Sequence, residues 1–157
     1  MTAQICDQII WQGKRYSLYC EPFLQYQLQH KDKARQFAFL HTTTANWRGY
    51  RARWEIKEDF LWLNAISGWV WQEQGKPKYY RLPQVMGTRE PVKATWFSGT
   101  LILPFGPLLR YVHMPYASQY AGEIRIKVVK GKIEQVNDKR LDTAMKQKCL
   151  SSTHQKQ

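Results

Sequence analysis

The sequence predicts a mainly β protein, a single antiparallel sheet domain closed as a barrel or a sandwich, with one or two short helices. Residues 50–57 alternate strictly between apolar and charged side chains, which is the period of a half-buried strand. Residues 123–128 repeat this alternation. Aromatic residues make up 14% of the chain and include seven tryptophans, a composition typical of a β fold with an aromatic core. The side chains that alternation turns inward are Tyr50, Trp54, Ile56, Ile124 and Ile126.

The N-terminal third predicts a hairpin and then a helix. Short apolar runs at residues 9–11 and 15–19 flank a glycine turn, which indicates a first β-hairpin. Pro22 is suited to open a short helix. A charged, exposed connection then leads to an apolar strand over residues 37–41.

The central hairpin is the clearest local signal in the chain. The alternating strand over residues 50–57 meets a short polar turn, and an apolar aromatic run resumes at residues 60–63. Gly49 lies directly upstream, where its lack of a side chain would permit a bulge or a close backbone approach.

The second half predicts shorter strands separated by breakers. A strand over residues 79–82 is followed by a surface loop over residues 83–91, and a strand over residues 100–103 is expected to stop at Pro104. Residues 108–114 resume as strand or extended chain. The last hairpin joins the alternating strand over residues 123–128 to residues 132–136 through Lys130-Gly131.

The domain expectation is a β-rich globular domain over residues 1–138 and a polar, basic, partly disordered tail over residues 139–157. Cys6 and Cys20 fall opposite each other if the first hairpin turns at its glycine, but reduced thiols are favoured over a disulfide.

The formal net charge of +12 favours a polyanionic partner, either nucleic acid or an acidic protein surface. Basic proteins are also common, so the charge can serve solubility alone. No apolar run could span a bilayer and no signal peptide is visible, so we expect a cytoplasmic protein without a membrane partner. The oligomeric state is not readable.

No catalytic, metal or cofactor signature stands out. Ser98 and His113, with Glu123 or Asp59, could supply a serine hydrolase, but the Gly-x-Ser-x-Gly elbow is missing around Ser98. The histidines and cysteines lack metal-ligand spacing, and there is no glycine-rich phosphate loop. The sequence therefore favours a non-enzymatic protein with no cofactor, no metal and no catalytic residue.

Two groups of side chains are candidates for binding a partner. Basic residues on the outer side of the predicted hairpins suit phosphates, and two tryptophans beside loops suit a base or a protein partner. The basic candidates are Arg48, Arg51, Arg53, Arg125, Lys127, Lys130 and Lys132, and the aromatic candidates are Trp69 and Trp71. The alternative reading is that the aromatics form the core and the charges its solvated outer face, and for Trp54 that reading is favoured.

Several segments, read together, resemble a family of small bacterial proteins without a known activity. They cover most of residues 8–136. The resemblance is carried by Gly13-Lys14-x-Tyr16-Ser17-Leu18, Thr44-Ala45-Asn46-Trp47-Arg48-Gly49-Tyr50, Trp54-Glu55-Ile56, Trp96-Phe97-Ser98-Gly99-x-Leu101, Pro104-x-Gly106 and Tyr111-Val112-His113-Met114. The chain departs from the family pattern at Pro115 and at Ala121-Gly122. The resemblance implies one intact domain of bacterial cytosolic origin and nothing about chemistry.

Three hypotheses of function remain. The first is an accessory protein that binds an anionic partner, either nucleic acid or a nucleic-acid-bearing complex. The alternative is a protein-binding inhibitor or immunity-type protein of a bacterial conflict or antiviral defence system. The third is a hydrolase that uses Ser98 and His113.

Overall fold

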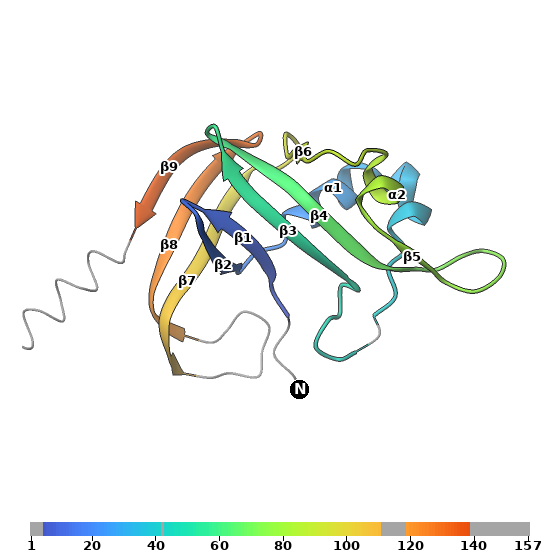
Figure 1. Cartoon of the computed structure of the whole chain (residues 1–157), viewed down its shortest axis with the longest axis horizontal. Helices are drawn as coiled ribbons and strands as arrows, with labels where there is room; N and C mark the ends of the chain where they lie inside the picture. The colour runs from blue at the N-terminus through green and yellow to red at the C-terminus, as the bar shows by residue number, and fades with distance from the viewer. Residues whose placement is uncertain (1–4, 42, 111–118, 139–157) are drawn as a thin grey trace, which may run out of the picture.

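The computed structural model describes residues 5–41, 43–110 and 119–138, and this part of the chain is mainly β (Figure 1). Nine strands form one sheet in the order β2-β1-β3-β4-β9-β8-β7, with β5 and β6 paired to β4. The strands are β1 (Asp7–Trp11), β2 (Lys14–Leu18), β3 (Tyr50–Lys57), β4 (Phe60–Val70), β5 (Lys78–Tyr80), β6 (Val92–Lys93), β7 (Gly99–Arg110), β8 (Gln119–Val129) and β9 (Lys132–Asp138). The helices are α1 (Pro22–Gln29), the 3₁₀ segment η1 (Lys31–Phe37) and α2 (Leu82–Met86).

The sheet curls until its two outermost strands meet. Directly after β2, the Tyr19 N–H donates to the carbonyl of Ile102 on β7 at 2.8 Å. This contact brings the ends of the sheet together, so the fold is a nearly closed barrel (Figure 1). The predicted fold class is confirmed.

All three predicted hairpins are present. Each turns through two residues with positive φ, the backbone geometry that matches the twist of paired strands. The turn residues are Gln12-Gly13, Glu58-Asp59 and Lys130-Gly131.

One strand pair differs from the predicted antiparallel arrangement. β1 runs parallel to β3, with Ile9 paired to Trp54, while the other strand pairs are antiparallel. Parallel neighbours need a long crossover, and here β2, α1 and η1 supply it. Local alternation contains no information about strand direction, which is why the sequence did not reveal this pair.

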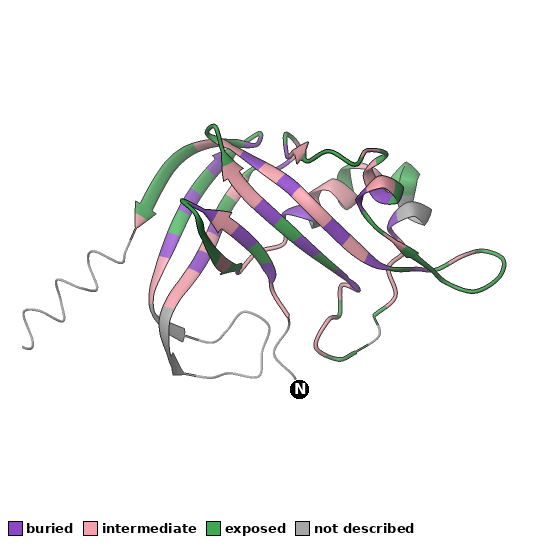
Figure 2. Cartoon of the chain, viewed as in Figure 1, coloured by how far each residue is buried: buried purple, intermediate pink, exposed green. Residues whose placement is uncertain are grey.

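The core lies inside the barrel, and buried and exposed residues alternate along its strands (Figure 2). Of the residues expected there, Tyr50, Trp54, Ile124 and Ile126 are at most 1% exposed, and Ile56 is half-buried against the same cluster. From α1, the fully buried Phe23 packs edge-on against Tyr50, with ring centroids 5.4 Å apart.

β4 contains a bulge that the alternation of its side chains reflects. Arg53 pairs with Ala65 but Trp54 pairs with Leu63, so Asn64 is an extra residue on β4. Before the bulge the odd-numbered positions point inward, and after it the even-numbered positions do, beginning with Ile66. A bulge of this kind keeps the apolar residues of a long strand on one face.

Three expectations about local structure were wrong in extent. β7 continues through Pro104, because β7 ends the order of the sheet and Pro104 needs no N–H there. Residues 37–41 form only an isolated bridge, between Phe39 and Val70. Residues 83–91 begin in α2, because Leu82 and Val85 are buried and Gly87, at φ 77°, ends the helix.

Cys6 and Cys20 do not form a disulfide with each other. Asp7 pairs with Leu18, so the hairpin register places Cys20 one residue away from the position opposite Cys6. The expected tail over residues 139–157 lies outside the described residues. Within the described ranges, no helix has both the length and the apolar character needed to cross a membrane.

Candidate functional site

The outer face of the central hairpin combines large basic residues with small ones. Alternation places Arg51 and Arg53 of β3 outward, and both are exposed. Across the hairpin they pair with two small residues of β4, Arg51 with Ser67 and Arg53 with Ala65. Small side chains beside long ones leave a depression, so β4 forms the floor of a groove and β3 forms one wall.

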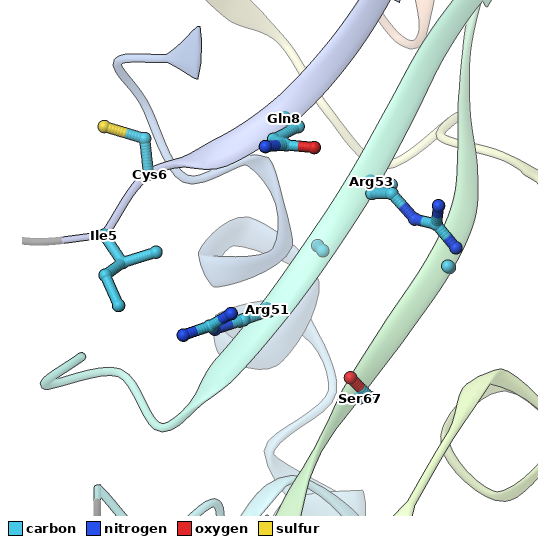
Figure 3. Close-up of a pocket in the computed structure, with 8 residues that line it drawn as sticks. Ile5, Cys6, Gln8, Arg51, Arg53 and Ser67 are labelled. Atoms are coloured by element: carbon cyan, nitrogen blue, oxygen red, sulfur yellow. The ribbon is translucent and has the colours of Figure 1, made fainter. Parts of the chain in front are cut away.

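A hollow of about 270 Å³ lies on the β1 side of this face (Figure 3). Arg51 extends towards Ile5 and Arg53 towards β4, so their guanidinium groups point apart (Figure 3). Like charges side by side on a strand repel, and divergence relieves that repulsion. The residues that line this hollow are Ile5, Cys6, Gln8, Arg51, Ala52, Arg53, Ala65 and Ser67.

A second hollow of about 350 Å³ lies on the other side of β4. It shares Arg53, Ala65 and Ser67 with the first hollow, so the two lie side by side across the hairpin. Its residues are Arg53, Asn64, Ala65, Ile66, Ser67, Tyr79, Arg81, Leu82, Pro83 and Arg89. We call the two hollows together the arginine groove, with Arg51, Arg53, Arg81 and Arg89 as its cations.

Arg81 and Arg89 were missed in the sequence, because their segment was interpreted as a strand end and a surface loop. Both reach the groove because α2 packs beside β4, with Leu82 and Val85 buried. The first turn of α2 is held by Gln84, whose Oε1 accepts the Arg81 N–H at 2.8 Å. One signal was available: in the strand predicted over residues 79–82, Arg81 lies two residues after Tyr79 and would share its side. In the structure β5 ends at Tyr80 and Arg81 is the N-cap of α2.

The arginine groove is electrostatically one-sided. No aspartate or glutamate is among the described residues that line either hollow. The acidic side chain that reaches its border is Glu55, which accepts a hydrogen bond from Asn64 Nδ2 at 2.9 Å. Four guanidinium groups around a shallow floor therefore form a surface that attracts anions.

Arg48 does not belong to this surface, which corrects the strip expected from the sequence. Its side chain is 8% exposed and its Nη2 donates to Asp7 Oδ1 at 2.5 Å. Asp7 also accepts from Trp54 Nε1 at 3.0 Å and from the Ala52 N–H at 3.2 Å. Burial raises the pKa of the Asp7 carboxyl, while the Arg48 charge and these donors act in the opposite direction. Arg48 therefore ties β1 to the central hairpin from the inside.

The second expected strip is exposed but separate. Arg125 and Lys127 lie on β8, Lys130 in the following turn and Lys132 on β9. Arg125 is paired with Glu123, which offsets part of its charge. In the sheet, β9 lies between β8 and β4. None of these four residues lines the arginine groove.

The two aromatic candidates are exposed at the far end of β4. Trp69 is 46% and Trp71 49% exposed. Trp69 packs edge-on against Tyr79 of β5, with ring centroids 5.3 Å apart, and Tyr79 itself is 45% exposed. Tyr79 also lines the arginine groove, and it was not among the residues predicted from the sequence.

One member of the hydrolase candidate, His113, lies outside the described residues, so its pairing with Ser98 stays a prediction. Ser98 has structural bonds: its Oγ accepts the Lys130 N–H at 2.9 Å, and its own N–H donates to Gln25 Oε1 at 3.1 Å. Among the described residues, no three His, Cys, Asp or Glu side chains gather in a way that could hold a metal ion. Burial raises the pKa of Cys6, which lines the groove, to about 11, so its thiol is protonated at neutral pH.

The resemblance to a bacterial family stays a prediction, and no part of the site depends on it. No protein-family model, curated protein or solved structure matches this chain.

Proposed function

We propose that the protein binds nucleic acid through the arginine groove, as a non-enzymatic accessory protein. The observation that carries the proposal is a pair of adjacent hollows that share Arg53, with four arginines and no acidic residue among the described residues that line them. A guanidinium group can bind a phosphate through two parallel hydrogen bonds, which makes arginine the favoured residue for this partner. A cytoplasmic location belongs to the same proposal.

The shape of the groove supports a polymer over a single small anion. Its cations come from β3 and from the segment around α2, on opposite sides of β4. Arg51 and Arg53 are two residues apart on one strand, so their Cα atoms are separated by roughly 7 Å. Charges distributed in this way can contact successive phosphates of a chain. The net charge of +12 would also accelerate the encounter with such a chain.

Binding to fluorescein-labelled oligonucleotides, measured by anisotropy between about 50 and 200 mM salt, tests the proposal. The variant Arg51→Ala/Arg53→Ala should bind every sequence more weakly. Its plot of log K against log salt should be shallower by about one unit for each lost phosphate contact. Because both side chains are exposed, the thermal midpoint should change little.

The matched control is Arg125→Ala/Lys127→Ala, which also removes two charges two residues apart on one exposed strand face. It should retain most of the parental affinity and salt slope. Equal losses in the two variants would show that total charge alone drives binding. No retention of DNA or RNA at about 50 mM salt would reject the proposal.

A protein partner with an acidic surface is the second candidate, as in an inhibitor or immunity-type protein of a bacterial defence system. Half-exposed Trp69 and Trp71 favour it, because tryptophan and arginine are the residues most enriched at interface hot spots. A stoichiometric complex that survives nuclease and moderate salt, and is lost in Trp71→Ala, would favour this candidate.

A further inference from the structure

We infer that the arginine groove takes single-stranded nucleic acid, with one unstacked base packed on Trp69. This inference rests on the proposed function and specifies its substrate class.

Trp69 lies directly beyond the floor of the groove on β4. Ala65, Ser67 and Trp69 alternate with the buried Ile66, Gly68 and Val70, so all three lie on the outer face of β4. Trp69 is two residues beyond Ser67, the last residue of the groove floor, which is a Cα separation of roughly 7 Å. The indole ring therefore stands where a chain leaving the groove along β4 would arrive.

Tyr79 connects the Trp69 ring to the cations of the groove. Tyr79 lines the groove and also contacts the Trp69 ring. The Arg81 guanidinium lies 5.6 Å from the centre of the Tyr79 ring, an arrangement that holds the tyrosine in place. Arg81 at the start of α2, Tyr79 on β5 and Trp69 on β4 thus follow one another.

A further hollow lies beside Trp69. It measures about 350 Å³ and is lined by Leu40, Trp69, Lys76 and Pro77. Three of these side chains are apolar and the fourth is an ammonium group. A planar base has two apolar faces and is attached to a phosphate, so this combination suits a nucleotide at the end of the groove.

The exposed ring of Trp69 favours a single strand over a duplex. In a duplex each base is paired and stacked inside the helix, and its face is inaccessible to a side chain. A single strand presents its faces, and aromatic stacking accepts every base because each has a π surface. We therefore expect little sequence preference.

The test compares three probes of about 12 units: oligothymidine, an abasic oligomer with the same phosphates, and a duplex of the same length. The parental protein should bind oligothymidine roughly 5- to 150-fold more tightly than the abasic oligomer, the range expected for one stacked base. Oligouridine should behave like oligothymidine. The duplex should bind more weakly than either single strand with bases.

Substitution of the ring separates stacking from phosphate contacts. Trp69→Ala should lower affinity for oligothymidine to the level of the abasic oligomer and leave abasic binding unchanged. Trp69→Phe should retain part of the difference. The matched control is Trp62→Ala at the opposite end of β4, where Lys57 and Lys93 already cover the ring. That variant should retain the preference for bases.

The outcomes distinguish this inference from the proposal that it extends. Equal binding of abasic oligomer and oligothymidine, or a Trp69→Ala variant that still prefers bases, overturns the inference while binding through arginines stands. Tighter binding of the duplex also overturns it. Failure of all three probes to bind at about 50 mM salt rejects both this inference and the proposed binding of nucleic acid.

Discussion

At the scale of single residues, Asp7 connects the inside of the fold to the hairpin that carries the groove. The residue is 1% exposed, and its carboxylate accepts hydrogen bonds from β3 and from the preceding loop. Arg48, Ala52 and Trp54 supply the donors. A buried ion pair is weak evidence of net stabilisation, but removal of one partner leaves an uncompensated buried charge.

We therefore predict that Asp7→Ala lowers the free energy of unfolding by about 3–5 kcal/mol. The double variant Asp7→Leu/Arg48→Met should cost much less than the sum of its single changes, because no charge is then left alone. Urea denaturation measures both.

The matched control is Glu123→Ala, which breaks the ion pair with Arg125 on β8. The side chains of that pair are 31% and 48% exposed, so the loss should be at most about 1 kcal/mol. An Asp7→Ala loss equally small would contradict a structural role for the buried pair.

At the scale of elements, β4 positions both the groove and the aromatic pair. Its bulge at Asn64 shifts the alternation, so Ala65, Ser67 and Trp69 all face outward. Near its end, the segment through residue 39 crosses close to the hairpin, and this approach depends on Gly49 and Gly68. A Cβ at Gly68 would lie 2.6 Å from the Gly49 carbonyl oxygen and 2.7 Å from a Phe39 ring carbon.

Gly68→Ala should therefore reduce the free energy of unfolding by about 1–3 kcal/mol, because either backbone or ring must move. The matched change is Gly75→Ala, whose Cβ would meet nothing within 4 Å but whose φ of +87° disfavours a side chain. That variant should lose about 1 kcal/mol. Thermal unfolding monitored by circular dichroism shows which of the two variants loses more stability. A Gly68→Ala variant as stable as the parent would show that the backbone or the Phe39 ring can move at little cost.

At the scale of the whole molecule, the barrel separates its buried core from the candidate binding surface. Its interior is filled by side chains around Trp54, which is fully buried and donates its Nε1 hydrogen to Asp7. The basic groove occupies the outer face, where a change of residue need not disturb the core. Exposed tryptophans belong to that outer face as well.

The two kinds of tryptophan should differ greatly in how much stability their replacement by alanine costs. Trp54→Ala is expected to cost about 3–5 kcal/mol of unfolding free energy, because it opens a cavity and removes a donor from a buried carboxylate. Trp71→Ala should change it by only about 0.5 kcal/mol. Denaturant titration followed by far-UV circular dichroism, with its β-dominated signal, measures both. Similar losses in the two variants would contradict the assignment of core and surface.

Much of this fold follows from local pattern in the sequence. Period-two alternation predicted β3 and β8, and the same pattern predicted that Arg51 and Arg53 are exposed. Turn residues placed all three hairpins. These predictions succeeded because the side-chain period of a strand and the backbone preference of a turn depend on residues within a few positions of each other.

The remainder of the site depends on contacts between residues distant in the sequence. Arg48 looks like an outer cation locally, but Asp7, which lies 41 residues away, draws it inside. Arg81 and Arg89 reach the groove only because α2 packs beside β4. The parallel pairing of β1 with β3 likewise needs a crossover of three elements. Alternation determined which side chains face outward, whereas long-range packing decided which of those cations share one groove.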